Sequence, residues 1–211
     1  MSTPKLALCV NLTALVNIGL DTSIPRSLQA VDINMVAPED FMVHDRAYVD
    51  ALDMVLPASA TPQLIGYGVI KVVGQGDEPL YVCYQRPVAG GESRLHGNFS
   101  LGFGGHIEPE DEASSPIATV KASLQRELYE ECGLAVDPHD IVFEKLIVDT
   151  TNNVGKVHIG LPAIIEIDPT RLDTVIQTSE TGKLHLFTLD TLKKGIADFE
   201  SWSQLVIEEL L

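Results

Sequence analysis

Three glutamates gathered on one predicted helix are the residues of this chain whose types and spacing could do chemistry. Glu127, Glu130 and Glu131 stand at positions i, i+3 and i+4, so at about 100° per residue their side chains leave the helix from one face. Like charges at these spacings destabilise a helix by roughly 0.2–0.5 kcal/mol per pair, and the negative end of the helix dipole adds to the penalty. A hard cation such as Mg²⁺ or Mn²⁺ removes this conflict because it turns repulsion into shared coordination. The cluster therefore indicates either a divalent-metal site or a solvated face on which Arg126 pairs with Glu130.

The helix that carries the glutamates is well delimited in the sequence. Ser115 and Pro116 form a good pair of N-cap and first helical residue, and Gly133 suits the position just after the last turn. The apolar residues between them recur at spacings of three and four, which gathers them into a stripe that faces the core. They are Ile117, Val120, Leu124 and Leu128. The sequence predicts a helix over residues 116–132.

The elements around this helix are those of an α/β protein. Runs of β-branched and aromatic residues predict strands at 63–73 and 80–84, and the turn residues between them predict a hairpin. Apolar residues at helical spacing predict a closing helix near 198–211. The other expected strands cover residues 99–103, about 141–149, 156–167 and 183–188.

The first part of the chain has a less regular pattern. Pro25, Pro38 and Pro57 interrupt residues 1–60, and the segment 56–62 has the composition of a linker. We therefore expect an N-terminal extension over residues 1–60 and a main domain over residues 61–211. The extension could be a specificity lid, a dimerisation arm or simple packing, and the pattern does not distinguish these roles.

Composition narrows the classes of partner. The chain has 211 residues, of which 45% are hydrophobic, which suits one sizeable domain. It has 30 acidic and 14 basic residues, and the resulting net charge of −16 opposes binding to a polynucleotide backbone. No apolar run approaches the roughly 20 residues of a membrane helix. A small-molecule partner is therefore expected, without nucleic acid or membrane, and a homodimer stays open.

The cysteines and the first residues bear on the cellular compartment. Cys9, Cys83 and Cys132 are odd in number, widely spaced and flanked by apolar residues, as is typical of reduced core thiols. The apolar stretch at the start is interrupted by polar residues and lacks a clear cleavage site. These features indicate a cytoplasmic protein.

The segment Arg126-Glu-Leu-Tyr-Glu-Glu-Cys-Gly-Leu134, preceded by Gly104-Gly105, resembles the sequence signature of a known family. It matches the Arg-Glu-apolar-x-Glu-Glu-x-Gly-apolar core of the Nudix hydrolases. The order of elements over residues 61–211 is also similar to the α/β/α sandwich with a mixed sheet found in that family. The resemblance implies a pyrophosphohydrolase that acts on acid anhydrides, such as a nucleoside diphosphate linked to another group (NDP-X) or a related phosphoanhydride.

The chain departs from the family signature before the helix. The family pattern G-x5-E-x7-R-E puts the arginine 14 positions after the glycine, whereas Arg126 follows Gly105 by 21, an excess of seven. The acid expected in this loop is Asp111 instead of a glutamate. We expect the excess to lengthen the loop or the start of the helix without disturbing the glutamates. Residues 92–107 and 154–160 resemble a less characterised branch that is often described as phosphoesterase-like.

The resemblance also implies roles for individual residues. Glu127, Glu130 and Glu131 would bind one to three Mg²⁺ or Mn²⁺ ions, together with the backbone carbonyl of Gly105. One of these glutamates, or the later loop acid Glu180, would act as the general base.

Further residues are candidates for orienting groups or substrate contacts. Arg126 would orient a neighbouring acid, while His106, Arg86 and Arg94 could contact substrate phosphates. A histidine in this setting is more often structural, and an arginine is more often a surface charge. Weaker candidates for substrate contact are His158, Lys156, Tyr84 and Phe103.

Two other functions remain open on the same fold. The chain could be a non-catalytic module that senses a metabolite or binds a protein, although the intact glutamate trio argues against this reading. Diphosphate isomerisation is another possibility, but the sequence has no obvious catalytic Cys and Glu pair outside the signature to support it.

Overall fold

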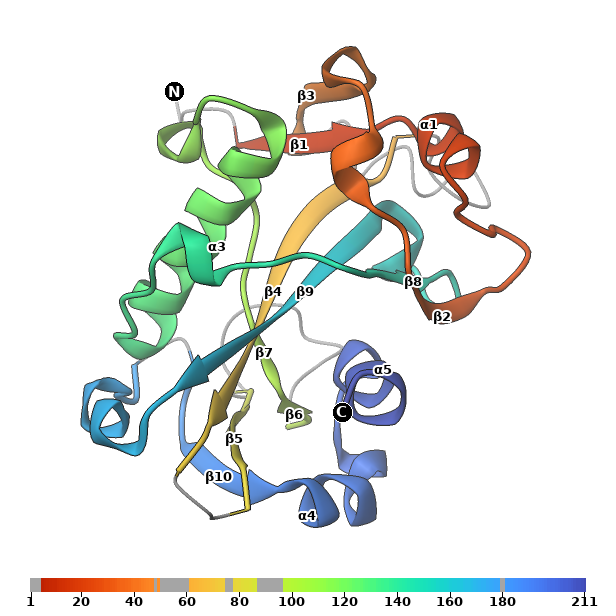
Figure 1. Cartoon of the computed structure of the whole chain (residues 1–211). Coiled ribbons are helices and arrows are strands. Elements are labelled where there is room, and N and C mark those ends of the chain that lie inside the picture. The colour runs from red at the N-terminus through yellow and green to blue at the C-terminus, as the bar shows by residue number, and fades with distance from the viewer. Residues whose placement is uncertain (1–4, 48, 50–60, 75–77, 87–96, 179–180) are drawn as a thin grey trace. The chain divides into compact units, whose positions relative to one another are not determined.

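The computed structural model describes residues 5–47, 49, 61–74, 78–86, 97–178 and 181–211. Contacts divide the chain into two compact units (Figure 1). Unit one comprises Met1–Gly66, Gly105–Ser123 and Phe143–Pro162, and unit two comprises Tyr67–Gly104, Leu124–Val142 and Ala163–Leu211. Three elements contribute residues to both units. They are β4 (Gln63–Val72), α3 (Pro116–Cys132) and β9 (His158–Ile167).

Unit one contains the strands of the N-terminal segment. Strand β1 (Leu6–Val10) pairs in antiparallel fashion with β3 (Phe41–Asp45) along its whole length. Strand β2 (Arg26–Gln29) pairs with β8 (Leu146–Asp149), which in turn pairs with β9. The short helix α1 (Leu12–Asn17) follows β1, and the Asn11 side chain caps it by accepting a hydrogen bond from the Thr13 N–H. The described part of residues 1–60 thus supplies three paired strands.

Unit two contains the predicted hairpin and the C-terminal elements. Strand β5 (Leu80–Gln85) pairs in antiparallel fashion with β4 and, on its other edge, with β10 (Leu184–Thr188). Two-residue strands β6 (Phe99–Ser100) and β7 (Gly102–Phe103) pair with β5 and β4. Two helices, α4 (Leu189–Lys194) and α5 (Ser201–Glu209), follow β10. Strands β4 and β9 are sheet neighbours and run in the same direction in Figure 1, so the sheet is mixed.

Helices cover both faces of β4 in unit two. A Cβ atom on Gly68 would lie 3.2 Å from Leu124 Cδ1, so the apolar stripe of α3 packs on one face of the strand. The neighbouring residue Tyr67 points to the opposite face because side chains alternate along a strand. There its ring lies 5.7 Å from the ring of Trp202 in α5. This arrangement is the expected α/β/α layering.

Short 3-10 helices make most of the remaining connections. They span Ile33–Met35, Pro38–Asp40, Pro109–Asp111, Pro138–Asp140, Gly155–Val157, Pro169–Thr174 and Ile196–Asp198. Within the described part of the chain, no helix combines the length and the apolar character needed to cross a membrane. The three cysteines are buried thiols, as predicted, and burial raises the pKa of Cys132 to about 12.

Most predicted elements are confirmed, and the differences have local causes. The strand expected from residue 141 begins only at Leu146, because Ile141 still donates its N–H to the carbonyl of Pro138 in a 3-10 turn. The strand expected at 99–103 is divided in two next to Gly102, where a Cβ atom would lie 2.0 Å from the Tyr67 ring. The closing helix begins at Ser201 instead of residue 198 because Glu200 caps it.

Candidate active site

The helix α3 has the boundaries that the sequence predicts. Ser115 caps its start, since its Oγ accepts a hydrogen bond from the Ala118 N–H at 3.2 Å. Gly133 ends it with a φ of +74°, a left-handed conformation that suits glycine, and donates its N–H to the Tyr129 carbonyl at 2.9 Å. The caps fix where the last two turns stand, and these turns carry the glutamates.

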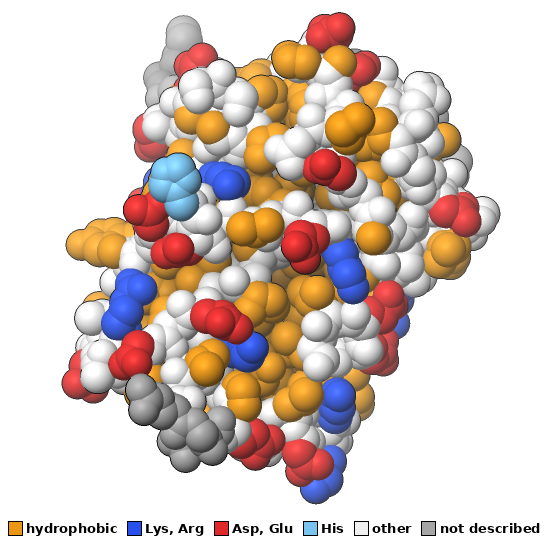
Figure 2. Space-filling model, viewed as in Figure 1, with side chains coloured by type: hydrophobic (Ala, Val, Ile, Leu, Met, Phe, Trp, Pro, Cys, Tyr) orange, Lys and Arg blue, Asp and Glu red, His pale blue; other side chains and the backbone are white. Residues whose placement is uncertain are grey.

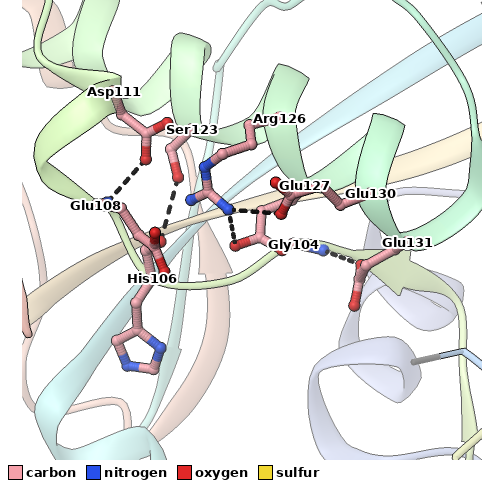
Figure 3. A network of polar contacts seen from close by, with 9 residues as sticks. All are labelled: Gly104, His106, Glu108, Asp111, Ser123, Arg126, Glu127, Glu130 and Glu131. Carbon is pink, nitrogen blue, oxygen red and sulfur yellow. Dashed lines mark hydrogen bonds and ion pairs between the residues drawn. The ribbon is translucent and has the colours of Figure 1, made fainter. Parts of the chain in front are cut away.

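Arg126 lies between two of the three glutamates. Its Nη1 is 3.0 Å from Glu127 Oε1 and 3.0 Å from Glu130 Oε2 (Figure 3). The Glu127 side chain is 13% exposed and that of Glu130 is 50% exposed, so the contact with Glu127 is the better shielded from solvent. The Arg126–Glu130 pair suggested by the sequence is therefore present. The same guanidinium also neutralises Glu127.

Glu131 is held separately from the other two glutamates. Its carboxylate is buried and accepts a hydrogen bond from the Gly104 N–H at 2.9 Å (Figure 3). Its backbone carbonyl accepts hydrogen bonds from the hydroxyls of Thr178 and Thr181, at 2.9 Å and 3.0 Å. The side chain and the backbone carbonyl of Glu131 are therefore both held by hydrogen bonds. The Gly-Gly pair that precedes the helix in the signature has a direct structural role here.

The loop around residue 180 is attached to the end of α3 by residues that the sequence analysis missed. Thr178 and Thr181 bracket the predicted general base Glu180, which lies outside the described residues, as does Arg94. The sequence carries no strong signal for these threonines, because hydroxyl residues are common in loops of every kind. Their hydrogen bonds bring this loop to Glu131.

Arg86 lies in the same unit as the glutamates, close to the ring of Tyr84. Its guanidinium carbon is 5.5 Å from the centre of that ring, and its buried Nε has no hydrogen-bond partner among the described residues. Burial alone would lower the pKa of Arg86. The negative fields of Tyr84, Glu200, Tyr67 and Glu131 outweigh that effect and raise it. A partly buried cation with an unpaired donor suits an anionic ligand.

The loop before α3 belongs to unit one and is built around Asp111. This buried carboxylate accepts a hydrogen bond from the Glu108 N–H at 2.8 Å, which closes the 3-10 turn Pro109–Asp111 (Figure 3). The loop acid of the signature therefore has a structural contact. Gly105, which is predicted to bind the metal through its carbonyl, belongs to the same unit, and so does His106. The three glutamates belong to unit two.

His106 contacts a second histidine. Its Nε2 lies 3.2 Å from Nε2 of His158, and its carbonyl oxygen is 3.5 Å from Ser123 Oγ. Burial, followed by the positive fields of Arg46, His158 and Lys5, lowers the pKa of His106 to about 3. The ring is therefore neutral at physiological pH, which removes the charge that a direct phosphate contact would use.

The carboxylates fit a hard divalent cation by their chemistry but do not converge as they stand. Among the described residues, no three His, Cys, Asp or Glu side chains form a group that could hold a metal ion. Glu127 and Glu130 contact Arg126 instead, and Glu131 contacts the Gly104 N–H. Two of the three carboxylates thus already share one cation, the guanidinium. Carboxylate oxygens are the ligands that Mg²⁺ prefers.

Charged side chains of both signs are mixed on the drawn face of the molecule (Figure 2). On the face drawn in Figure 2, the described Lys and Arg side chains lie singly among Asp and Glu side chains. Such a face does not offer the basic tract that binding to a polynucleotide requires.

Comparisons with known proteins decide the family. No protein-family model matches the chain. Protein YmaB of Bacillus subtilis (strain 168) is 37% identical over 150 residues, which are 70% of each chain, so the two are relatives. The crystal structure of Tm1382, a candidate Nudix hydrolase, has the same fold with a TM-score of 0.72 and 21% identity, over 98% of both chains. This chain belongs to the same family as Protein YmaB, and it has the Nudix fold.

A second structure with the Nudix fold matches a smaller part of this chain. The Nudix domain of Shewanella oneidensis NrtR, determined in complex with ADP-ribose, has a TM-score of 0.51 and 12% identity. The match covers 70% of this chain and 84% of that one.

Proposed function

We propose that this chain, which has the Nudix fold, is a divalent-metal-dependent pyrophosphohydrolase that cleaves the diphosphate bond of a small NDP-X or a related phosphoanhydride. One observation carries the proposal: the three glutamates of the signature occupy the last turns of α3, each held by a cation or by a backbone N–H. Like charges at these spacings destabilise a helix unless a counter-charge offsets them. Arg126 offsets two of the three carboxylates, and in the proposed enzyme a bound metal ion would do so for all three.

In the proposed mechanism the glutamates are the metal ligands. Glu127, Glu130 and Glu131 would hold Mg²⁺ or Mn²⁺, with the carbonyl of Gly105 as a further ligand. When bound, the metal supplies an activated water and neutralises charge on the leaving phosphate. Arg126 orients Glu127 and Glu130 through its two 3.0 Å contacts.

Other residues of the chain would handle the proton and the substrate. Glu180, or one of the three glutamates, would take a proton from the attacking water as general base. Arg86, whose Nε has no hydrogen-bond partner in the described part of the chain, would bind a substrate phosphate, and Arg94 and His106 are further candidates for substrate contact. Because His106 is neutral at physiological pH, we assign it a hydrogen-bonding contact instead of an ion pair.

The net charge, a solved structure of similar fold and the buried cysteines support the proposed substrate class and compartment. A charge of −16 disfavours polynucleotides and leaves small molecules as the substrate class. ADP-ribose is a reasonable first candidate, since the NrtR domain of similar fold was determined with it. Three buried thiols support a cytoplasmic location.

The proposal is tested by nucleotide and phosphate release from a panel of phosphoanhydrides. The panel contains ADP-ribose, dinucleoside polyphosphates, NADH, nucleotide sugars and nucleoside triphosphates, each with Mg²⁺, with Mn²⁺ and with EDTA. We expect turnover of one class that EDTA abolishes and that Glu131→Gln reduces by roughly 10²–10³-fold. Glu144→Gln, a change at an exposed glutamate of unit one, should leave the rate unchanged.

Failure of the whole panel would overturn the hydrolase. If no member is turned over, but one binds equally well to the wild type and to Glu131→Gln, the chain is a sensing or interaction module that does not use the glutamates. Turnover that survives EDTA would contradict the role of the metal.

A further inference from the structure

Unit one contains a small cavity that the proposed chemistry does not use. It has a volume of about 220 Å³ and lies between N-terminal residues and the connection from β8 to β9. Its apolar wall includes Leu20, Val148 and Ile159, all of which are buried. The glutamates of α3 are not among its lining residues.

Residues with a cationic or a hydroxyl side chain, namely Lys156, Thr22 and Thr150, are also among those that line the cavity. Lys156 lines it, and among the described residues its ammonium group has one long contact, 3.5 Å to Asn153 Oδ1, which leaves donors for a ligand. Thr22 and Thr150 contribute the hydroxyls. The Thr150 hydroxyl donates to the Pro25 carbonyl at 3.2 Å and therefore presents its lone pairs as acceptors. An apolar wall with a few converging polar groups is typical of a ligand site.

The loop that carries Lys156 is held in place before any ligand binds. Asp149 is buried and accepts hydrogen bonds from the Thr151 N–H at 3.1 Å and from the Asn152 side chain at 2.9 Å. The Asn152 side chain in turn accepts from the Gly155 N–H at 2.9 Å. A Cβ atom on Gly155 would lie 1.8 Å from the Asp149 carbonyl oxygen, so only glycine permits this approach. Such preorganisation reduces the entropic cost of binding.

His158 links the cavity to His106. Its Nδ1 is 2.7 Å from the Val154 carbonyl oxygen, which can only accept, so Nδ1 carries the proton. Nε2 of His158 lies within hydrogen-bond distance of Nε2 of His106, at 3.2 Å. His106 directly follows the Gly104-Gly105 pair of the signature. A ligand in the cavity therefore touches a ring that is hydrogen-bonded to the signature loop.

We propose that this cavity is a binding site for a small hydroxylated anion of the sugar-phosphate class. Lys156 would bind the phosphate, the two threonine hydroxyls would bind ring hydroxyls, and the apolar wall would contact the C–H face of the ring. The volume of about 220 Å³ is smaller than the roughly 300–1,000 Å³ of sites for drug-sized ligands, which favours one sugar phosphate over a full dinucleotide. This site is an addition to the proposed hydrolase and does not depend on it.

The test is calorimetric titration of the full chain with ribose 5-phosphate in the presence of EDTA, so that neither metal nor turnover contributes. We expect saturable binding that is tighter than that of inorganic phosphate or ribose alone. Lys156→Met should weaken it by about 10-fold or more, because a charge-assisted hydrogen bond is lost. Lys193→Met, at an exposed position of α4, is the matched control and should bind as the wild type does.

Two outcomes would overturn the site. One is the absence of saturable binding, or equal affinities of the wild type and Lys156→Met for ribose 5-phosphate. The other is inorganic phosphate binding as tightly as ribose 5-phosphate, since the hydroxyls would then contribute nothing.

NMR spectra of the histidine side chains show where ribose 5-phosphate binds. Long-range ¹H–¹⁵N spectra should show the ring nitrogens of His158, and through them those of His106, shifting as ribose 5-phosphate saturates the chain. Saturable binding with unchanged histidine signals would assign the probe to another part of the molecule and overturn the site. Because hydrolysis is not measured, failure here leaves the hydrolase proposal intact, and failure of the substrate panel leaves this one intact.

Discussion

Arg126 supplies the positive charge beside the glutamates of α3. In the proposed active enzyme, a divalent cation supplies it. Arg126 contacts Glu127 and Glu130 at 3.0 Å each, and its own side chain is only 17% exposed. A shielded pair of this kind is costly to break from one side, because the remaining carboxylate stays partly buried without its partner. Arg126 is therefore a positioning residue whose effect on stability can be separated from its effect on activity.

We expect Arg126→Met to lower the free energy of unfolding by about 1–3 kcal/mol in EDTA, since the shielded contact between the guanidinium and Glu127 is then lost. Urea unfolding at neutral pH measures this. The double variant with Glu127→Gln should recover part of the loss, and saturating Mg²⁺ should reduce it. If the single variant is as stable as the wild type in EDTA, the contact contributes nothing and the argument fails.

His106 should make stability depend on pH. Its pKa of about 3 in the folded chain lies below the ordinary value of about 6.5, so between these values the unfolded chain binds more protons. The free energy of unfolding therefore rises with pH through this window, by at most about 1.4 kcal/mol per unit, and the contribution is complete above about pH 6.5. The groups that face the ring are His158, Arg46 and Lys5.

Urea titrations between about pH 5 and pH 6.5 check this dependence. His106→Gln should flatten the slope, whereas His139→Gln, at an exposed histidine, should leave it as in the wild type. Equal slopes in all three proteins would show that His106 is not the group responsible.

At the scale of elements, α3 is the part of the fold that depends most on its ends. Its C-terminal glycine is required for two reasons. Gly133 has a φ of +74°, and a Cβ atom there would lie 2.9 Å from the carbonyl oxygen of Thr174. The last turn carries Glu130 and Glu131, so a shift of this end would move the proposed metal ligands.

We expect Gly133→Ala to cost at least about 1 kcal/mol more than Gly97→Ala. Gly97 has a similar φ of +83°, but a Cβ atom there would meet nothing within 4 Å, so its alanine variant carries only the left-handed strain of about 1–2 kcal/mol. Thermal unfolding of the two variants separates the cost of the left-handed backbone from the cost of the steric clash with Thr174. Equal losses would mean that the Thr174 backbone yields at little cost.

At the scale of the whole molecule, charge is the dominant property. The chain carries −16 at neutral pH, and such a charge opposes the compact state through self-repulsion. A cation that binds only the folded chain stabilises it in two ways. Its binding shifts the folding equilibrium by mass action, and its charge reduces the repulsion.

Mg²⁺ should therefore raise the unfolding temperature beyond what ionic strength alone produces. At about 100 times its dissociation constant, a ligand specific to the folded state adds about 2.7 kcal/mol, which corresponds to several degrees for a chain of this size. Scanning calorimetry with Mg²⁺ and with NaCl of equal ionic strength measures the difference. Glu131→Gln should remove most of it, and identical shifts with the two salts would argue against a specific site.

The sequence alone determined α3 and the trio on it, because caps, the apolar stripe and the spacing of the glutamates are local properties of one segment. The same locality explains why the β4–β5 hairpin was predictable. The boundary near residue 60 stays a prediction.

Only the tertiary structure decided what holds the trio and what surrounds it. Gly104 reaches Glu131 across 27 residues, Thr178 reaches it across 47, and His106 meets His158 across 52. The pairing of β1 with β3 and the structural contact of Asp111 likewise required coordinates. Local patterns record propensity and amphipathicity, whereas contacts between distant segments arise from packing of the whole chain, and the sequence carries no periodic signal for them.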